Sequence, residues 1–122
     1  MSIQIVTIAI ETDGSGGFST DTPELNGKLV QVQYDFGGLA ATLDLTVTGK
    51  KTGMTMLGVT NLAAADARFA PRQPVHDNAL AAMTYDGTRP IEDFIYLAEA
   101  FSVVVAQGGT SVSGELHLFI EV

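Results

Sequence analysis

An alternation of apolar and polar side chains constrains the fold of this chain more than any other feature. Within residues 28–36 it runs from Val30 to Phe36, it continues through 42–48, and Phe101, Val103 and Val105 recur at the same spacing. A period of two places every second side chain on the same face of an extended strand. These segments therefore predict half-buried β-strands, and the sequence as a whole predicts an all-β fold.

Glycine-marked turns separate the alternating segments. They are predicted at residues 13–17, 26–27, 37–38, 49–53 and 107–110. The Asn-Gly pair at 26–27 is an especially strong turn signal. The spacing predicts a single-domain β-sandwich or jelly roll of about eight antiparallel strands over residues 1–122. Two three-stranded meanders joined by one long connection, at about residues 60–90, fit a Greek-key arrangement.

The first strand is predicted over residues 3–12 and changes its phase partway along. Ile3 and Ile5 share one face, whereas Val6 and Ile8 share the other. Such a phase change indicates either a β-bulge or a strand that is covered on both faces.

The connection at about residues 60–90 is the longest part of the chain without strand alternation. A connection of this length in a small domain is usually a binding loop or an interface arm. Its alanine-rich stretches, 61–68 and 78–83, could each form a single helical turn, since alanine has the highest helix propensity. Neither stretch is long enough to form a stable helix alone.

Composition and charge narrow the classes of function. The chain has no cysteine, which excludes a disulfide framework and a thiolate metal site. Its net charge of −8 disfavours partners such as nucleic acid or an anionic membrane surface. Its first residues lack the cationic segment of a signal peptide, and no apolar run approaches the ~20 residues that cross a bilayer. We therefore expect a soluble protein made in the cytoplasm.

The catalytic and metal-binding patterns in the sequence are weak. His76 and Asp77, with Asp66, could begin a metal site, but their spacing through a proline-containing loop specifies no geometry. His117 alternates with core residues of the last predicted strand and is better explained as a solvent-side or interface histidine. We expect His76 to be a surface histidine.

The remaining candidates for catalysis are equally weak. The glycine-rich turn at 13–17 lacks the lysine and the following helix of a phosphate-binding loop. No Gly-x-Ser-x-Gly elbow is present, and Glu92 and Asp93 would point to opposite faces of a strand. The sequence predicts no catalytic, cofactor-binding or metal-binding residue, and we expect a protein that is not an enzyme and needs no cofactor.

A proline-stiffened segment within the long connection is the candidate partner interface. Arginine and aromatic residues are typical of interface hot spots, and a stiff loop loses little entropy on docking. Alternatively, the segment folds back over the edge of its own sheet and its phenylalanine plugs the sandwich; both interpretations can hold together. The candidate interface residues are Arg68, Phe69, Pro71, Arg72, Pro74 and His76.

Two stretches of the chain resemble a known class of protein. The run from Arg68 to Asn78, followed by alanines, and the closing pattern from Phe101 to Glu121 resemble small virion proteins of tailed bacteriophages. The Ile-rich opening strand and the 13–17 turn extend the similarity over most of the chain. The class concerned is the head decoration, or cement, proteins.

The resemblance implies a β-sandwich or jelly-roll domain that binds the assembled head in many copies and stabilises it. Its partners would be the major capsid protein, or another virion protein, and further copies of itself, with a trimer as one arrangement. It would be made in the host cytoplasm and would lie on the capsid surface of the virion. Related proteins imply two alternatives: a tail or head–tail junction component, and a tail-tip module that binds a carbohydrate or a receptor.

Overall fold

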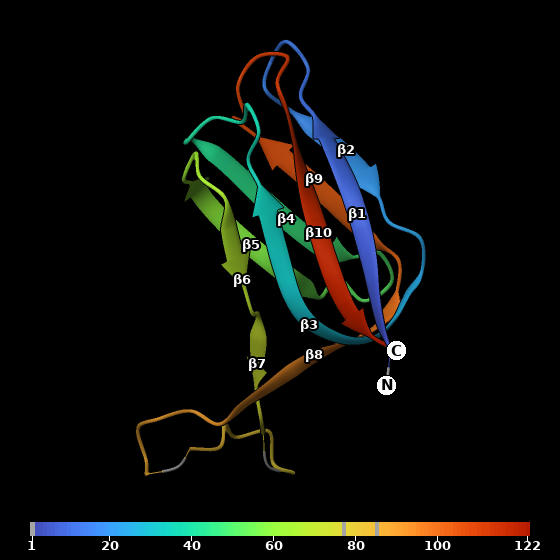
Figure 1. Ribbon diagram of the computed structural model, residues 1–122. Coiled ribbons are helices and arrows are strands. Elements are labelled where there is room, and N and C mark those ends of the chain that lie inside the picture. Colours follow the sequence, from blue (N-terminus) through green and yellow to red (C-terminus); the bar gives the residue numbers. More distant parts are fainter. Residues whose placement is uncertain (1, 77, 85) are drawn as a thin grey trace.

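The computed structural model describes residues 2–76, 78–84 and 86–122. These residues form two antiparallel β-sheets and no helix, so none that could span a membrane. The predicted all-β fold and the β-sandwich are therefore confirmed. Figure 1 shows the two sheets as the layers of the sandwich, with the N- and C-termini close together at one end.

The larger sheet has six strands and the smaller has four. The larger runs in the order β1-β10-β3-β8-β7, and β6 also pairs with β3. The smaller runs in the order β2-β9-β4-β5. The strands are β1 (Ile3–Glu11), β2 (Phe18–Asp21), β3 (Leu25–Asp35), β4 (Leu43–Gly49), β5 (Thr55–Leu62), β6 (Ala67–Phe69), β7 (Arg72–Pro74), β8 (Glu92–Glu99), β9 (Phe101–Ala106) and β10 (Ser113–Glu121).

The predicted meanders are wrong, because consecutive strands cross between the sheets. β3 lies in the larger sheet, whereas β4 and β5 form a hairpin in the smaller one. β8 and β9 also lie in different sheets, although only Ala100 separates them. Alternation identifies the buried face of a strand but not its neighbour. A bend at a single residue can therefore carry the chain from one sheet to the other at a corner of the sandwich.

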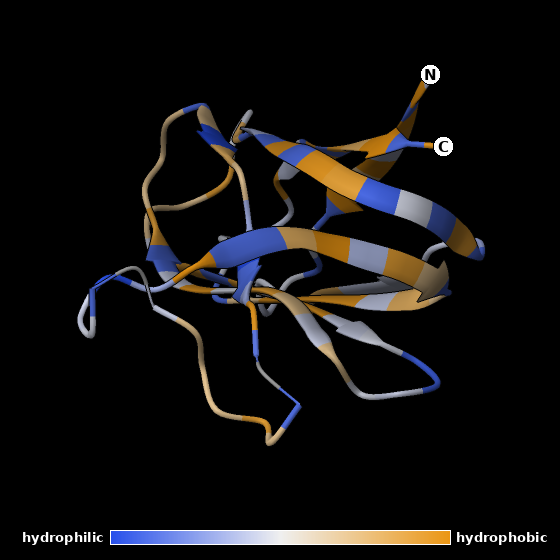
Figure 2. Ribbon diagram, turned by 90° about the horizontal axis from the view of Figure 1, so that it is seen from below, coloured by the Kyte–Doolittle hydropathy of each residue, from blue (hydrophilic) through white to orange (hydrophobic). Residues whose placement is uncertain are grey.

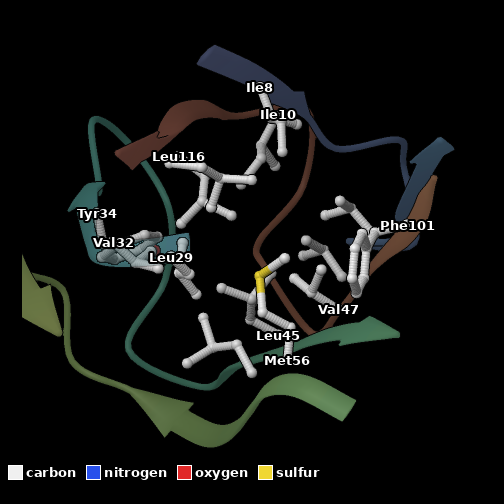
Figure 3. Close-up of a cluster of buried hydrophobic side chains, with 14 of the residues drawn as sticks. Ile8, Ile10, Leu29, Val32, Tyr34, Leu45, Val47, Met56, Phe101 and Leu116 are labelled. Carbon is white, nitrogen blue, oxygen red and sulfur yellow. The ribbon is translucent and has the colours of Figure 1, made fainter. Parts of the chain in front are cut away.

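Apolar side chains from both sheets meet between the layers and form the core. Figure 2 shows hydrophobic and hydrophilic residues succeeding one another along the strands, as the alternation predicted. In Figure 3, Leu29, Val32 and Leu116 of the larger sheet face Leu45 and Val47 of the smaller. All five are fully buried. The hydrophobic effect on these side chains is the main force that holds the sheets together.

Tyr34 is also fully buried, and its hydroxyl group has no hydrogen-bond partner among the described residues. Burial raises the pKa of this phenol above its usual value of 10. Tyr34 therefore buries a polar atom that no described residue compensates with a hydrogen bond.

The opening strand β1 corrects the prediction made from its phase change. It pairs with β10 residue for residue from Ile3 to Glu11, with no bulge. Its outward face is not covered either, since Ile3 is 47% and Ile5 is 56% exposed. Neither a bulge nor a covered outer face therefore explains why this strand has apolar residues on both faces.

The predicted turn at residues 26–27 is also wrong, because Asn26 and Gly27 lie inside β3. Gly27 has a φ of 131°, and a Cβ at this position would lie 2.4 Å from the carbonyl oxygen of Glu121. The glycine is therefore explained by the close approach of β10 and by its backbone conformation, and not by a turn.

The long connection is more regular than predicted. It contains the short strands β6 and β7, and neither alanine-rich stretch forms a helical turn among its described residues. A three-residue strand is too short to show alternation, and prolines are tolerated on edge strands. An isolated helical turn fixes several dihedrals for one hydrogen bond, which alanine propensity does not offset.

Candidate interaction site

The feature that departs from the sandwich is a projecting arm, which we define as residues 72–94. Its stem is the pairing of β7 with the first residues of β8, from Arg72 opposite Phe94 to Pro74 opposite Glu92. The remainder of β8 pairs with β3 in the sandwich. Figure 1 shows the stem and its distal loop extending well beyond both sheets. The arm is therefore the part of the chain best placed to reach another molecule.

Two cationic side chains lie over the aromatic ring of Phe94 at the root of the arm. The guanidinium carbon of Arg72 lies 4.0 Å from the centroid of the Phe94 ring, and the Lys28 ammonium lies 4.7 Å from it. Lys28 belongs to β3 and also pairs with Glu121 on β10 at 3.6 Å. The Arg72 contact thus joins the two strands of the stem, and the Lys28 contact connects the stem to β3.

The distal loop, residues 75–91, is held by its own backbone. Val75 N–H donates to the carbonyl of Ile91 at 2.8 Å, and Ile91 N–H donates to the carbonyl of Met83 at 3.0 Å. Met83 N–H in turn donates to the carbonyl of Val75 at 2.8 Å. The three segments that contain these residues therefore lie side by side.

A charged turn closes the tip of the loop. The Asp86 carboxylate accepts hydrogen bonds from the amides of Arg89 and Thr88, from the Thr88 hydroxyl and from Arg89 Nε. These donors, the Arg89 amide foremost, lower the pKa of Asp86 to about 2. The carboxylate is thus ionised over the whole physiological range.

Leu80 in this loop has an unusual exposure and an unusual backbone conformation for a leucine. It is 83% exposed and has a φ of 66°, in the left-handed region. A bulky leucine is disfavoured in that region, and its exposure gains nothing from the hydrophobic effect. Met83, in the same loop, is 41% exposed. Met83 lies beside Val75 and Ile91, where the loop joins the stem, so Leu80 is the apolar side chain that the loop exposes most.

The structure separates the predicted interface residues into two groups. Arg68 and Phe69 belong to β6, on the sandwich: Arg68 is exposed opposite Gln33, and Phe69 packs against the core opposite Val32. The interpretation in which Phe69 plugs its own sandwich is therefore supported.

The other predicted residues lie at the root of the arm or on it. Arg72 Nη1 donates to the Pro71 carbonyl at 3.0 Å, so Arg72 is engaged within its own chain. Pro74, the last residue of β7, is exposed, and His76 is exposed and forms an isolated backbone bridge with Ala82. The six residues form no single patch, but Arg72, Pro74 and His76 follow the arm outwards.

Sequence reasoning missed three residues that define the arm. Phe94 points away from the core because its neighbour Ile95 is buried, and the alternation along β8 contained this signal. Lys28 reaches the Phe94 ring only because β3 and β8 are adjacent, which the sequence does not reveal. Nothing in the sequence marks Leu80, since its exposure depends on the direction of the loop.

The weaker candidate sites have local structural roles. Asp66 accepts a hydrogen bond from the Phe36 amide at 3.2 Å, and His117 Nδ1 lies 2.9 Å from the Thr7 hydroxyl. Asp77 lies outside the described residues. Within the described part of the chain, no group of three His, Asp or Glu side chains has an arrangement suited to a metal ion.

The glycine-rich turn at 13–17 is occupied by its own aspartate. Asp13 Oδ1 accepts hydrogen bonds from the amides of Ser15 at 2.8 Å and Gly17 at 3.1 Å. These donors, Gly17 foremost, lower the pKa of Asp13 below its usual value. The amides that a phosphate would need thus already face a carboxylate.

Comparison of the chain with protein-family models and with curated proteins found no match.

Proposed function

We propose that this protein is a non-enzymatic structural component of a tailed-bacteriophage virion that decorates the assembled head in many copies and stabilises it. Its partner in this proposal is the major capsid protein or another virion protein, and it lies on the capsid surface. It binds neither nucleic acid nor a membrane, and its net charge of −8 is consistent with a position away from packaged DNA.

The observation that carries the proposal is the arm with its exposed leucine. The Leu80 side chain is 83% exposed and its backbone is in the left-handed region, so this residue has no evident role in folding. An apolar residue on a projecting, hydrogen-bonded loop is well suited to fill a pocket on a neighbouring molecule. The resemblance of residues 68–78 and 101–121 to virion decoration proteins gives that neighbour its proposed identity.

A repeated contact explains how one short arm can stabilise a large shell. Among the described residues, the arm exposes two large apolar side chains, Leu80 and Met83, so one contact is weak. A shell presents the same site at every equivalent position, and linked copies bind more tightly than separate ones. Pulling shell subunits apart would then also require breaking the contacts of the arms that connect them.

The proposal is tested by counting copies of the chain in purified particles, using quantitative mass spectrometry against the most abundant shell protein. A ratio near one is expected. A handful of copies would replace the head assignment with the tail or head–tail junction, and absence from the particles would overturn the virion assignment altogether.

A second experiment tests the arm itself. Because Val75 and Ile91 are hydrogen-bonded partners, an Asn-Gly dipeptide in place of residues 76–90 would close the hairpin with a two-residue turn. We expect this variant to fold but not to bind stripped shells. The subtler variant Leu80→Asn removes the apolar side chain and suits the left-handed conformation. Val104→Thr, at an apolar residue of the smaller sheet that is 44% exposed, is the matched control and should bind normally.

A further inference from the structure

The edges of the two sheets differ in how they are protected against pairing with another strand. Edge strands are normally kept short, charged, bulged or interrupted by proline. β7 has three residues, among them Arg72 and Pro74. β2 has four, and its Asp21 pairs with Lys50 at 2.6 Å. β5 is longer, but its pairing with β4 shifts register at two places.

β1 has none of these devices. It has nine residues, no proline and no lysine, and it pairs with β10 without a register shift. Its one charged residue, Glu11, is at its end. Within the part of the chain that the structure describes, β10 is the only strand that pairs with β1. Its other edge therefore presents a long, regular row of backbone donors and acceptors.

We propose that β1 pairs antiparallel with β1 of a second copy of this chain, with the twofold axis at Thr7. This register places Thr7 opposite its own copy, Val6 opposite Ile8 and Ile5 opposite Ala9. Inward-facing residues then meet inward-facing ones, as the strict period of two in a strand requires. An interface with twofold symmetry must be complementary to itself, and the apolar pattern around Thr7 satisfies this condition.

The charge distribution also favours this partner and orientation. In the antiparallel register the two Glu11 carboxylates lie at opposite ends of the interface, each across from Ile3, so no like charges face each other. A hollow of about 180 Å³ lies beside the edge and is lined by residues 6–9 and 20–23. The partner's Val6 and Ile8 would lie over this hollow and would bury further apolar surface there.

A disulfide cross-link tests the register directly, because the natural chain has no cysteine. In Thr7→Cys the two new cysteines would lie directly opposite each other. Their Cα atoms would then be separated by a distance within the ~4.4–6.8 Å that a disulfide bond spans. We expect this variant to form a covalent dimer on mild oxidation of the purified protein. The matched control is Thr46→Cys, at an exposed position of central strand β4, and it should remain uncross-linked.

Charge substitutions at the same position provide the second test. Sedimentation should give the unmodified protein twice the mass of one chain. Thr7→Lys and Thr7→Glu should each weaken dimerisation by about fivefold or more, since like charges directly opposite destabilise a strand pair. An equimolar mixture of the two should form dimers again, and circular dichroism checks that both fold.

Three results would overturn the pairing: a protein that stays monomeric at high concentration, a trimer, or a dimer in which the Thr7→Cys variant cross-links no faster than the Thr46→Cys variant. All these measurements use the purified chain in solution. Their outcome is therefore independent of whether the protein belongs to a virion.

Discussion

Arg72 and Phe94 face each other across the stem of the arm, and the guanidinium carbon lies 4.0 Å from the ring centroid. This contact gives the predicted interface arginine a role within its own chain. Arg68, the other predicted arginine, is exposed on β6 and lies opposite Gln33 of the sandwich. The two arginines therefore differ in their contacts, although they are only four positions apart in one segment.

Replacing Arg72 by alanine should loosen the arm. We expect the free energy of unfolding to fall by about 0.5–1 kcal/mol, the usual contribution of an exposed cation–π contact. Proteolysis within residues 75–91 should also become faster, since the stem loses its anchor. Urea unfolding and limited proteolysis measure the two effects. Arg68→Ala is the control, and an equal effect there would contradict the anchoring role of the Arg72–Phe94 contact.

Adding a methyl group at Gly27 should destabilise the sandwich. Gly27→Ala would place a Cβ 2.4 Å from the Glu121 carbonyl oxygen, and we expect a loss of about 2–4 kcal/mol in chemical denaturation. Gly53→Ala separates the two causes, because Gly53 also has a positive φ, of 74°, but no atom within 4 Å of the added Cβ. It should lose only about 1 kcal/mol, the cost of the backbone conformation. Equal losses would show that the close approach at Gly27 is unimportant.

Removing the hydroxyl group of Tyr34 should stabilise the protein. Tyr34→Phe leaves the buried ring in place and deletes an oxygen that has no hydrogen-bond partner among the described residues. We expect a gain of about 1 kcal/mol in the free energy of unfolding, the lower end of the cost of an unsatisfied buried polar group. Tyr96→Phe, at a side chain that is 58% exposed, should change nothing. A clear loss of stability in Tyr34→Phe would mean that the hydroxyl is satisfied in solution.

Acid should open the turn that Asp86 holds at the end of the arm. The pKa of Asp86 is lowered from 3.8 to about 2 in the folded turn, so its stabilising effect is complete above pH 3.8. That effect is lost as the pH falls through about 2, where the folded carboxylate takes up its proton. NMR shifts of the Thr88 and Arg89 amides should therefore titrate with a midpoint near 2. In Asp86→Asn this transition should disappear, and a midpoint near 3.8 in the unmodified protein would argue against the turn.

The sequence predicted the strands well where one face is buried and the other solvated. Residues 31–35 alternate because Val32 and Tyr34 point into the core while Gln31 and Gln33 point out. The alternation breaks between Leu29 and Gln31, where the pairing of β3 with β10 shifts register. The order of the strands was not predictable in this way, since pairing partners depend on contacts between distant parts of the chain. Alternation therefore identified the buried face of a strand but not the sheet to which the strand belongs.

The candidate site was predictable only in outline. Pro71 and Pro74 correctly marked an unusual segment, but two three-residue strands within it leave no periodic signal. Asn26-Gly27 gave a false turn, because glycine serves close packing as well as turns. Leu80 was invisible to pattern analysis, since its exposure results from where the arm points and not from its neighbours in sequence.

β8 belongs to the arm and to the sandwich at once, and this has a mechanical consequence. Its first residues pair with β7, whereas Ile95 to Glu99 pair with Leu25 to Leu29 of β3. A force that pulls the arm along the axis of β8 would load all five of these pairs in shear at the same moment, instead of unzipping them one after another. Ile95 and Leu97, which are buried in that stretch, would have to leave the core together. Tension on the arm is thus carried by all five pairs to β3, and the arm detaches only when this part of β8 leaves the core.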